Sequence, residues 1–215
     1  MKRAIIILAA ASVLTPVAAL AHTGAGDTHG VVHGFMHPVT GLDHVLAMVA
    51  VGILAALLGG RTIWLVPASF VALAAVGGLL GVQGVLVPFV EFGISASVVL
   101  LGLAIALQAR LPLGWTVGLV GLFGLYHGYA HGAEMPADAS GFAYGAGFLA
   151  ATAMLHIAGI GLGLGIAHMA RRSATRFAQA GGTAIALAGI VLLVGILAYG
   201  FMLGARLMQK SNGDG

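Results

Sequence analysis

Two short clusters of histidine and carboxylate side chains are the groups in this chain that could bind a metal ion. The first cluster lies within the sequence HPVTGLDH and consists of His37, Asp43 and His44. The second cluster lies within the sequence HGYAHGAE and consists of His127, His131 and Glu134. Imidazole and carboxylate together suit borderline divalent ions such as nickel, cobalt or zinc. Both clusters adjoin long apolar segments, where polar side chains are costly and therefore indicate function.

The spacing within each cluster favours coordination. His127 and His131 are four residues apart, which is about one helical turn, so both imidazoles can reach one ion. Glu134 continues the same face three residues later. His37 and His44 are seven residues apart and share a face wherever this segment is helical. The spacing therefore predicts one metal-binding face on each of two helices.

The composition is that of an integral membrane protein. Of the 215 residues, 60% are hydrophobic and 7% are charged, against about 25% charged in a soluble domain. The mean hydropathy is +1.08. The chain has no cysteine, which excludes disulfides, thiolate metal sites and cysteine nucleophiles.

The first 21 residues have the pattern of a cleaved signal peptide. Lys2 and Arg3 precede an apolar run, and Ala19-Leu20-Ala21 is a small-residue cleavage site. We predict cleavage before His22, which places the mature N-terminus in the periplasm and the protein in the bacterial inner membrane. The alternative is an uncleaved first helix.

Six apolar segments follow, each long enough to cross a bilayer (about 20 residues). The fold class that they predict is an all-α integral membrane protein with a six-helix transmembrane bundle over 38–206. Residues 22–37 are predicted to form a periplasmic N-terminal arm, and 207–215 a periplasmic tail. We expect Pro38 in the first turn of the first helix, where its missing N–H costs nothing. The expected helices cover 38–58, 62–82, 85–108, 112–131, 141–169 and 177–205.

The arginines predict the orientation of these helices. With His22 outside, the first, third and fifth loops between helices lie in the cytoplasm. These loops contain all the basic residues found between helices, namely Arg61, Arg110, Arg171, Arg172 and Arg176. The asymmetry follows the positive-inside rule, although Arg206 and Lys210 then lie outside. The net charge of +3 is therefore explained by topology, and no nucleic-acid partner is expected.

With this orientation, both clusters lie at outer helix ends, and we expect them to form one shared site. Glu91 begins another helix on the same side, where it is a ligand, a partner that orients a histidine or a contact between helices. His156 is either functional or hydrogen-bonded to a neighbouring helix. His168 lies beside the cytoplasmic arginines and is interpreted as an interfacial side chain.

The mature N-terminus is a further candidate metal-binding segment. His22 would carry a free α-amine, and amine plus imidazole on one residue can chelate a divalent ion. Asp27, His29 and His33 follow on the same short stretch, which we expect to be flexible. The arm would gather scarce ions at the pore mouth, unless it is only a solvated tail.

Glycine is over-represented, with 35 residues, and part of it follows a helical period. In the segment 112–131 and just beyond it, glycines recur every three or four residues. Small residues on one face let neighbouring helices approach closely. We therefore predict that this histidine-bearing helix packs tightly at the centre of the bundle. The glycines lie at 114, 118, 121, 124, 128 and 132, and shorter repeats at 77/81 and 159/163.

At the two clusters the chain resembles the HupE/UreJ family of membrane proteins. That family is marked by an HPxxGxDHxxxMxxVG signature and an HGxxHGxE signature, and this chain has HPVTGLDHVLAMVAVG from His37 to Gly52 and HGYAHGAE from His127 to Glu134. The resemblance covers essentially the whole mature chain. It implies uptake of nickel, with cobalt as a second cargo, in association with the maturation of nickel enzymes (hydrogenase and urease). Carried over to this sequence, it points to the six residues of the two clusters.

Several other functions remain in competition. No GxxxxGK[ST] loop is present, and no serine lies in a nucleophile elbow, so we expect neither an ATPase nor another enzyme. Transport would be facilitated diffusion or secondary coupling. The alternatives are a cobalt transporter, a membrane haem protein, a metal-binding accessory protein that does not transport, and a copper transporter that uses the thioethers of Met36, Met48 and Met135.

Overall fold

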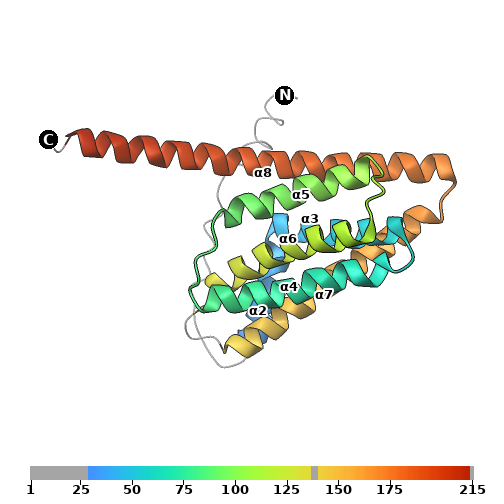
Figure 1. Ribbon diagram of the computed structural model, residues 1–215, viewed down its shortest axis with the longest axis horizontal. Coiled ribbons are helices and arrows are strands. Elements are labelled where there is room, and N and C mark those ends of the chain that lie inside the picture. Colours follow the sequence, from blue (N-terminus) through green and yellow to red (C-terminus); the bar gives the residue numbers. More distant parts are fainter. Residues whose placement is uncertain (1–28, 137–139, 214–215) are drawn as a thin grey trace, which may run out of the picture.

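Every regular element in the described part of the chain is a helix. The computed structural model describes residues 29–136 and 140–213, with side chains at 30–136 and 140–202. The helices, drawn in Figure 1, are α2 (His29–Thr40), α3 (Leu42–Leu58), α4 (Thr62–Val82), α5 (Val90–Ala106), α6 (Leu113–Ala133), α7 (Gly141–Ala167) and α8 (Arg171–Gly213). The predicted all-α class is confirmed. The predicted signal peptide and His22 lie outside the described residues.

The observed helices differ from the predicted segments mainly at their ends. α4 has the predicted bounds, and α5, α6 and α7 differ from them by a few residues. α8 begins at Arg171 and continues to Gly213, so it includes the expected loop at 171–176 and most of the expected tail. The described part of the predicted arm, 29–37, is helical and belongs to α2; its periplasmic location stays a prediction.

The first predicted helix is not continuous. Gly41 separates α2 from α3, and the two helices meet at an angle of 82°. Pro38 lies in the last turn of α2 and not in a first turn, so the prediction for Pro38 was wrong. Pro38 has no backbone N–H and therefore cannot donate a hydrogen bond within the helix. Gly41 has an extended backbone (φ −82°, ψ 116°). The first cluster therefore lies on both sides of a helix break.

The length and apolar character of the helices make this a multi-pass membrane protein. α4, α7 and the 171–202 part of α8 are each long and apolar enough to span a bilayer, and α2 with α3 would add a fourth span if the bent pair counts as one. α5 is apolar but shorter, and α6 carries two histidines in its last two turns. The six-span topology stays a prediction.

Glycines bring α6 and α4 into direct backbone contact. A Cβ at Gly124, Gly128 or Gly132 would overlap the backbone of α4, and one at Gly77 or Gly81 would overlap the backbone of α6. The predicted close packing of α6 is confirmed at these positions. Gly114 and Gly118, at the other end of α6, have nothing within 4 Å of a built Cβ. Only the half of α6 that carries the histidines is held in this way.

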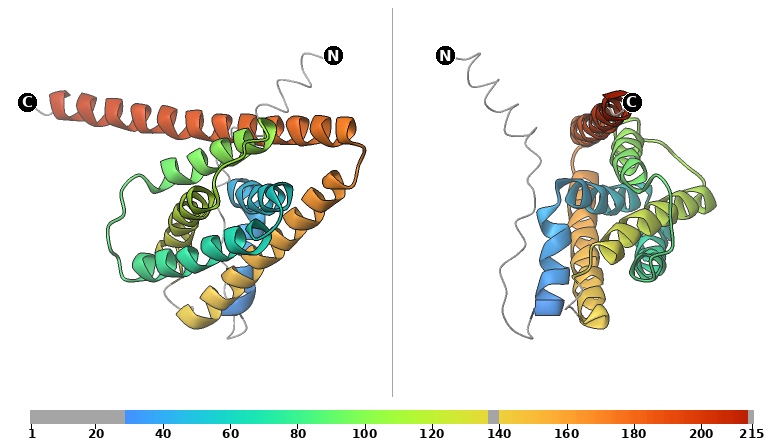
Figure 2. Two further views of the ribbon diagram at one scale, coloured as in Figure 1. Left: turned by 45° about the vertical axis from the view of Figure 1, so that its right-hand side comes forward. Right: turned by 90° about the vertical axis from the view of Figure 1, so that its left-hand side faces the viewer.

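Three other helix pairs pack in the same manner. Gly52 of α3 and Gly159 of α7 each face the backbone of the other helix, and Gly102 of α5 and Gly182 of α8 do the same. α2 lies along the first half of α7 (Figure 2). The result is a bundle in which α3 and α6 are flanked by other helices, and α8 covers α5 on one side (Figure 1).

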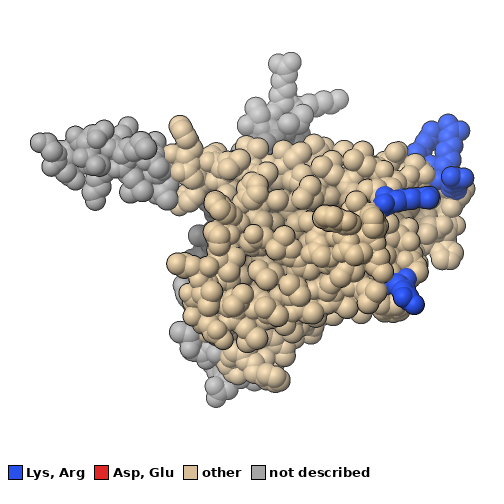
Figure 3. Space-filling view, in the orientation of Figure 1, with Lys and Arg blue, Asp and Glu red and all other residues tan. Residues whose placement is uncertain are grey.

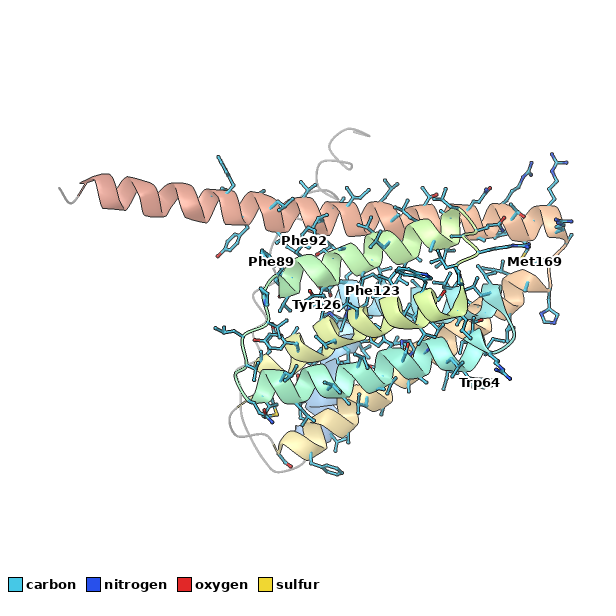
Figure 4. All side chains as sticks on the ribbon, in the orientation of Figure 1. Trp64, Phe89, Phe92, Phe123, Tyr126 and Met169 are labelled. Atoms are coloured by element: carbon cyan, nitrogen blue, oxygen red, sulfur yellow. The ribbon has the colours of Figure 1, made fainter. Side chains whose placement is uncertain are left out.

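The basic residues whose side chains the structure describes gather at one end of the bundle. Arg61, Arg110 and the arginines of 171–176 are exposed, and Figure 3 shows the blue side chains together at the end where α4 and α8 begin. Trp64 is 73% exposed at this end (Figure 4), as befits an aromatic ring at a membrane interface. The opposite end contains the last turns of α4 and α6 and the first turns of α5 and α7 (Figure 1).

Candidate metal site

α6 carries two histidines into the interior of the bundle. His127 and His131 are 0% and 2% exposed, because Gly124, Gly128 and Gly132 hold this part of the helix against α4. Burying an imidazole without hydrogen-bond partners is costly. The fold nevertheless places both rings at the end of the molecule that lies away from the arginines.

The hydrogen bond of His127 determines which of its nitrogens is free. Its Nδ1 lies 2.9 Å from the carbonyl oxygen of Phe123, and because a carbonyl can only accept, Nδ1–H is the donor. In the neutral ring the lone pair is then on Nε2. That atom is buried and has no hydrogen-bond partner in the protein. It is therefore available to coordinate a metal.

Asp43 orients His44 in a similar way. The Nδ1 of His44 lies 2.7 Å from the Oδ1 of Asp43, and the same oxygen accepts the backbone N–H of His44 at 2.8 Å. The Nε2 of His44 is buried and without a partner. A carboxylate that holds Nδ1–H of a histidine commonly accompanies metal binding through Nε2. The Oδ1 of Asp43 thus orients the ring of His44.

The two clusters meet through the ring of His131. Its centroid lies 4.8 Å from that of His37 and 4.4 Å from that of His44. The His44 and His127 rings are 4.9 Å apart. Neither nitrogen of His131 has a hydrogen-bond partner. Four imidazoles from α2, α3 and α6 are therefore in continuous contact.

Glu134 closes the outer side of this group. Its Oε2 lies 3.1 Å from the Nε2 of His37, and Glu134 itself follows the last residue of α6. The hydrogen bond from His37 is the main reason that the pKa of Glu134 lies below its ordinary value of 4.5. The side chains of His37 and Glu134 are 29% and 58% exposed, so this pair is the accessible edge of the cluster.

Gly41 leaves space for the Asp43–His44 pair. A Cβ at this position would lie 3.0 Å from both the Oδ1 of Asp43 and the Nδ1 of His44, which is closer than such atoms normally approach. The helix break and the orientation of His44 therefore depend on the same residue. Broken helices commonly supply ion sites in membrane transporters.

The described arrangement is not a closed coordination cage. No three His, Asp or Glu side chains among the described residues surround one point as the ligands of a bound ion would. The structure brings the six residues of the two clusters together, but a bound ion would require imidazole rings to rotate. Glu91 is exposed in the first turn of α5 and lines an open groove with Tyr126 and Phe92. Among the described residues, no hydrogen bond joins it to the six cluster residues.

Two further side chains border the cluster and were missed from the sequence. Tyr144 lies 6.5 Å from His37, and Phe148 lies 4.3 Å from His131, measured between ring centroids. Both belong to α7 and are buried. Their four-residue spacing would have shown that they share a helix face, but nothing in the sequence says which helix that face contacts.

His33 and His168 are two further histidines that lie outside the two clusters. His33 stacks on His37 with ring centroids 6.2 Å apart, so at least one residue of the predicted arm adjoins the site. His168 is exposed near the arginines, and its Nδ1–H donates to the carbonyl of Leu164 at 2.7 Å. These contacts agree with its interpretation as an interfacial side chain.

Comparison with known proteins agrees with the resemblance seen at the two clusters. The family model described as HupE / UreJ protein matches residues 9–192. The chain is 43% identical over 202 residues to Protein HupE from Rhizobium leguminosarum bv. viciae, and the alignment covers 91% of this chain and 100% of that protein. No solved structure matches the chain significantly.

Proposed function

The chain belongs to the HupE/UreJ family, and we propose that it takes up divalent nickel across the bacterial inner membrane. The cargo would bind at an extracytoplasmic site made of the two clusters. Cobalt is the second ion that this family and this ligand chemistry suggest. The ion is the substrate, and the protein is a permease and not an enzyme.

The observation that carries this proposal is the contact of His131 with both His37 and His44. Residues that are about ninety positions apart in the sequence supply adjacent imidazoles, and buried nitrogens of His44, His127 and His131 lack hydrogen-bond partners. Packing alone would be served better by apolar rings of the same size. Coordination of a metal ion would supply these nitrogens with the partner that they lack in the protein.

The geometry suggests the order in which the ion would meet its ligands. Glu134 and His37 are the exposed members, and a carboxylate there attracts a hydrated cation. His131 and His44 come next, at 2% exposure and with a side chain 12% exposed respectively, followed by His127 at 0%. Exchange of bound water for imidazole nitrogens along this series would move the ion inward without any covalent chemistry. We propose that transport occurs by facilitated diffusion or by secondary coupling.

Uptake of radiolabelled nickel into proteoliposomes at limiting nickel tests this function. His44→Ala and His131→Ala should each abolish high-affinity uptake, because each removes a ring from the contact group. His168→Ala is the matched control, since that histidine is exposed at the arginine end, and it should transport normally. Normal uptake by both site variants would refute the shared site.

Three finer parts of the proposal lie beyond this contact group. We propose that Glu91 assists ion entry from the first turn of α5.

We also propose that His22 begins a metal-gathering arm at the mature N-terminus. Replacing His22, His29 and His33 with Gln should then reduce uptake at trace nickel while the maximal rate stays nearly unchanged. We also propose that a nickel-enzyme maturation system receives the imported ion.

A further inference from the structure

His156 is a buried histidine that the site described above does not use. It lies on α7, is 2% exposed, and neither of its ring nitrogens has a hydrogen-bond partner in the protein. A histidine that only joins two helices would donate to a neighbour. Its position is also firm, because a Cβ at Gly52 of α3 would overlap the backbone of α7 at His156.

The side chain of Phe70 connects His156 with the outer cluster. The Phe70 ring centroid lies 5.0 Å from that of His156, with perpendicular planes, and 5.4 Å from that of His127. Phe70 is itself 0% exposed. His127 is the most buried residue of the outer group, so the Phe70 ring contacts both the innermost part of the proposed site and His156.

Thr152 adds a second unpartnered polar group beside His156. It lies four residues earlier on the same helix, so the two side chains share a face. Its Oγ1 is buried and makes no hydrogen bond, although a threonine within a helix can bond to the carbonyl four residues before it. An imidazole nitrogen and a hydroxyl oxygen are thus both left without partners on one face of α7, one helical turn apart.

We propose that His156 and Thr152 form an inner binding station for the same divalent ion, beside the Phe70 ring that also contacts His127 of the outer cluster. This inference rests on the proposed function. The inner station contains one imidazole and one hydroxyl, whereas the outer site also contains carboxylates, so the ion is held more weakly inside. Conduction requires sites that bind well enough to admit the ion and weakly enough to release it. A borderline ion such as nickel or cobalt fits an imidazole ligand, and calcium or magnesium does not.

Equilibrium dialysis of the purified full-length protein against nickel tests this station without requiring transport. The wild-type protein should bind a tight ion and a weaker one. His156→Leu should lose the weaker ion and keep the tight one, which also shows that the variant is folded. The matched control is His168→Leu, at the exposed residue that directly follows the same helix; it should keep both ions.

Uptake into proteoliposomes supplies the second readout. His156→Leu should lower the rate of nickel uptake by about tenfold, a typical loss when a metal ligand environment is damaged, while tight binding stays unchanged. Thr152→Val keeps the shape of the side chain and should weaken binding of the inner ion. It provides the test of the station if His156→Leu does not fold.

The outcomes separate the two proposals. A wild-type protein without a weaker ion, or His156 and Thr152 variants with wild-type binding and uptake, would overturn the inner station. Absence of tight nickel binding by the wild-type protein would instead count against the proposed function. Uptake that is insensitive to His44→Ala and His131→Ala would also count against it.

Discussion

At the scale of single residues, the chemistry of the site depends on which nitrogen of each imidazole is free. Asp43 holds the Nδ1 of His44 and Phe123 holds the Nδ1 of His127, so both rings keep Nε2 for a metal. The outer pair of His37 and Glu134 is more exposed and differs in being a contact between α2 and the end of α6. These two arrangements lead to different predictions.

Replacing Asp43 with Asn should weaken nickel binding without unfolding the protein. An amide no longer supplies a charge-assisted acceptor for the Nδ1–H of His44, and loss of such an orienting partner typically costs about 10- to 100-fold in metal affinity. Equilibrium dialysis of the purified variant measures the change. An unchanged dissociation constant would mean that the orientation of His44 does not matter for binding.

The contact between His37 and Glu134 should survive moderately acidic conditions. The pKa of Glu134 is lowered, first because it accepts a hydrogen bond from His37. A carboxyl group whose pKa is lower in the folded state stabilises the fold at pH values above its pKa in the unfolded state. This contribution is lost as the pH falls through its pKa in the folded state. The contact should therefore persist at the ordinary value of 4.5 and disappear below it. The infrared carboxylate band that is absent from Glu134→Gln reports this titration; a midpoint above the ordinary value would contradict it.

At the scale of helices, glycines decide where two backbones can touch. Gly128 faces the carbonyl of Ala74, whereas Gly118 of the same helix faces open space. The two positions therefore form a matched pair on α6, one beside the histidines and one away from them.

Gly128→Ala should destabilise the protein, and Gly118→Ala should not. The added methyl group would force α6 away from α4, and overpacking of this kind typically costs about 1–3 kcal/mol. Thermal unfolding in detergent should show a lower Tm for Gly128→Ala and an unchanged or higher Tm for Gly118→Ala. Equal Tm values for the two variants would show that the close approach of α4 and α6 does not contribute to stability.

Gly41→Ala should affect binding more than folding. The added Cβ would lie within 3.0 Å of the Asp43 and His44 side chains, which can move, and the extended backbone at this position suits alanine. We expect weaker nickel binding by equilibrium dialysis together with a nearly unchanged Tm. Gly118→Ala, on α6, is the control for the substitution itself. Wild-type affinity would show that the pair tolerates displacement.

At the scale of the whole molecule, the arginines with described side chains gather at one end (Figure 3), whereas the last turns of α6, which carry His127 and His131, lie at the other end (Figure 1). The positive-inside rule then predicts that the arginine end faces the cytoplasm. Because the natural chain has no cysteine, single cysteines can report this orientation without background labelling.

Ser140→Cys should react with a membrane-impermeant maleimide in intact spheroplasts. Ser140 is exposed directly before α7, at the end of the molecule that contains the site, and Met169 is exposed at the arginine end. Met169→Cys should react only after the membrane is permeabilised. The reverse pattern would place the two clusters on the cytoplasmic side and would contradict the proposed extracytoplasmic site.

Residue types and their spacing along the chain were sufficient to predict much of this protein. Long apolar segments between short loops indicate membrane helices, because the bilayer requires backbone hydrogen bonds to be satisfied within each segment. The glycine period predicted the close contacts of α6, and the two motifs predicted the family. The six cluster residues could also be named as candidates in advance, since histidine and carboxylate side chains are rare in such segments; their binding of a metal ion stays a prediction.

Only the tertiary structure decided how these residues meet. The break at Gly41 could not be predicted from helical spacing, which treats 38–58 as continuous, and it determines that His37 and His44 approach His131 from two different helices. The contact of Phe70 with both His127 and His156 joins α4, α6 and α7. Hydropathy and spacing describe each helix by itself, whereas these contacts depend on the rotation and depth of one helix against another, which close backbone packing at the glycines determines.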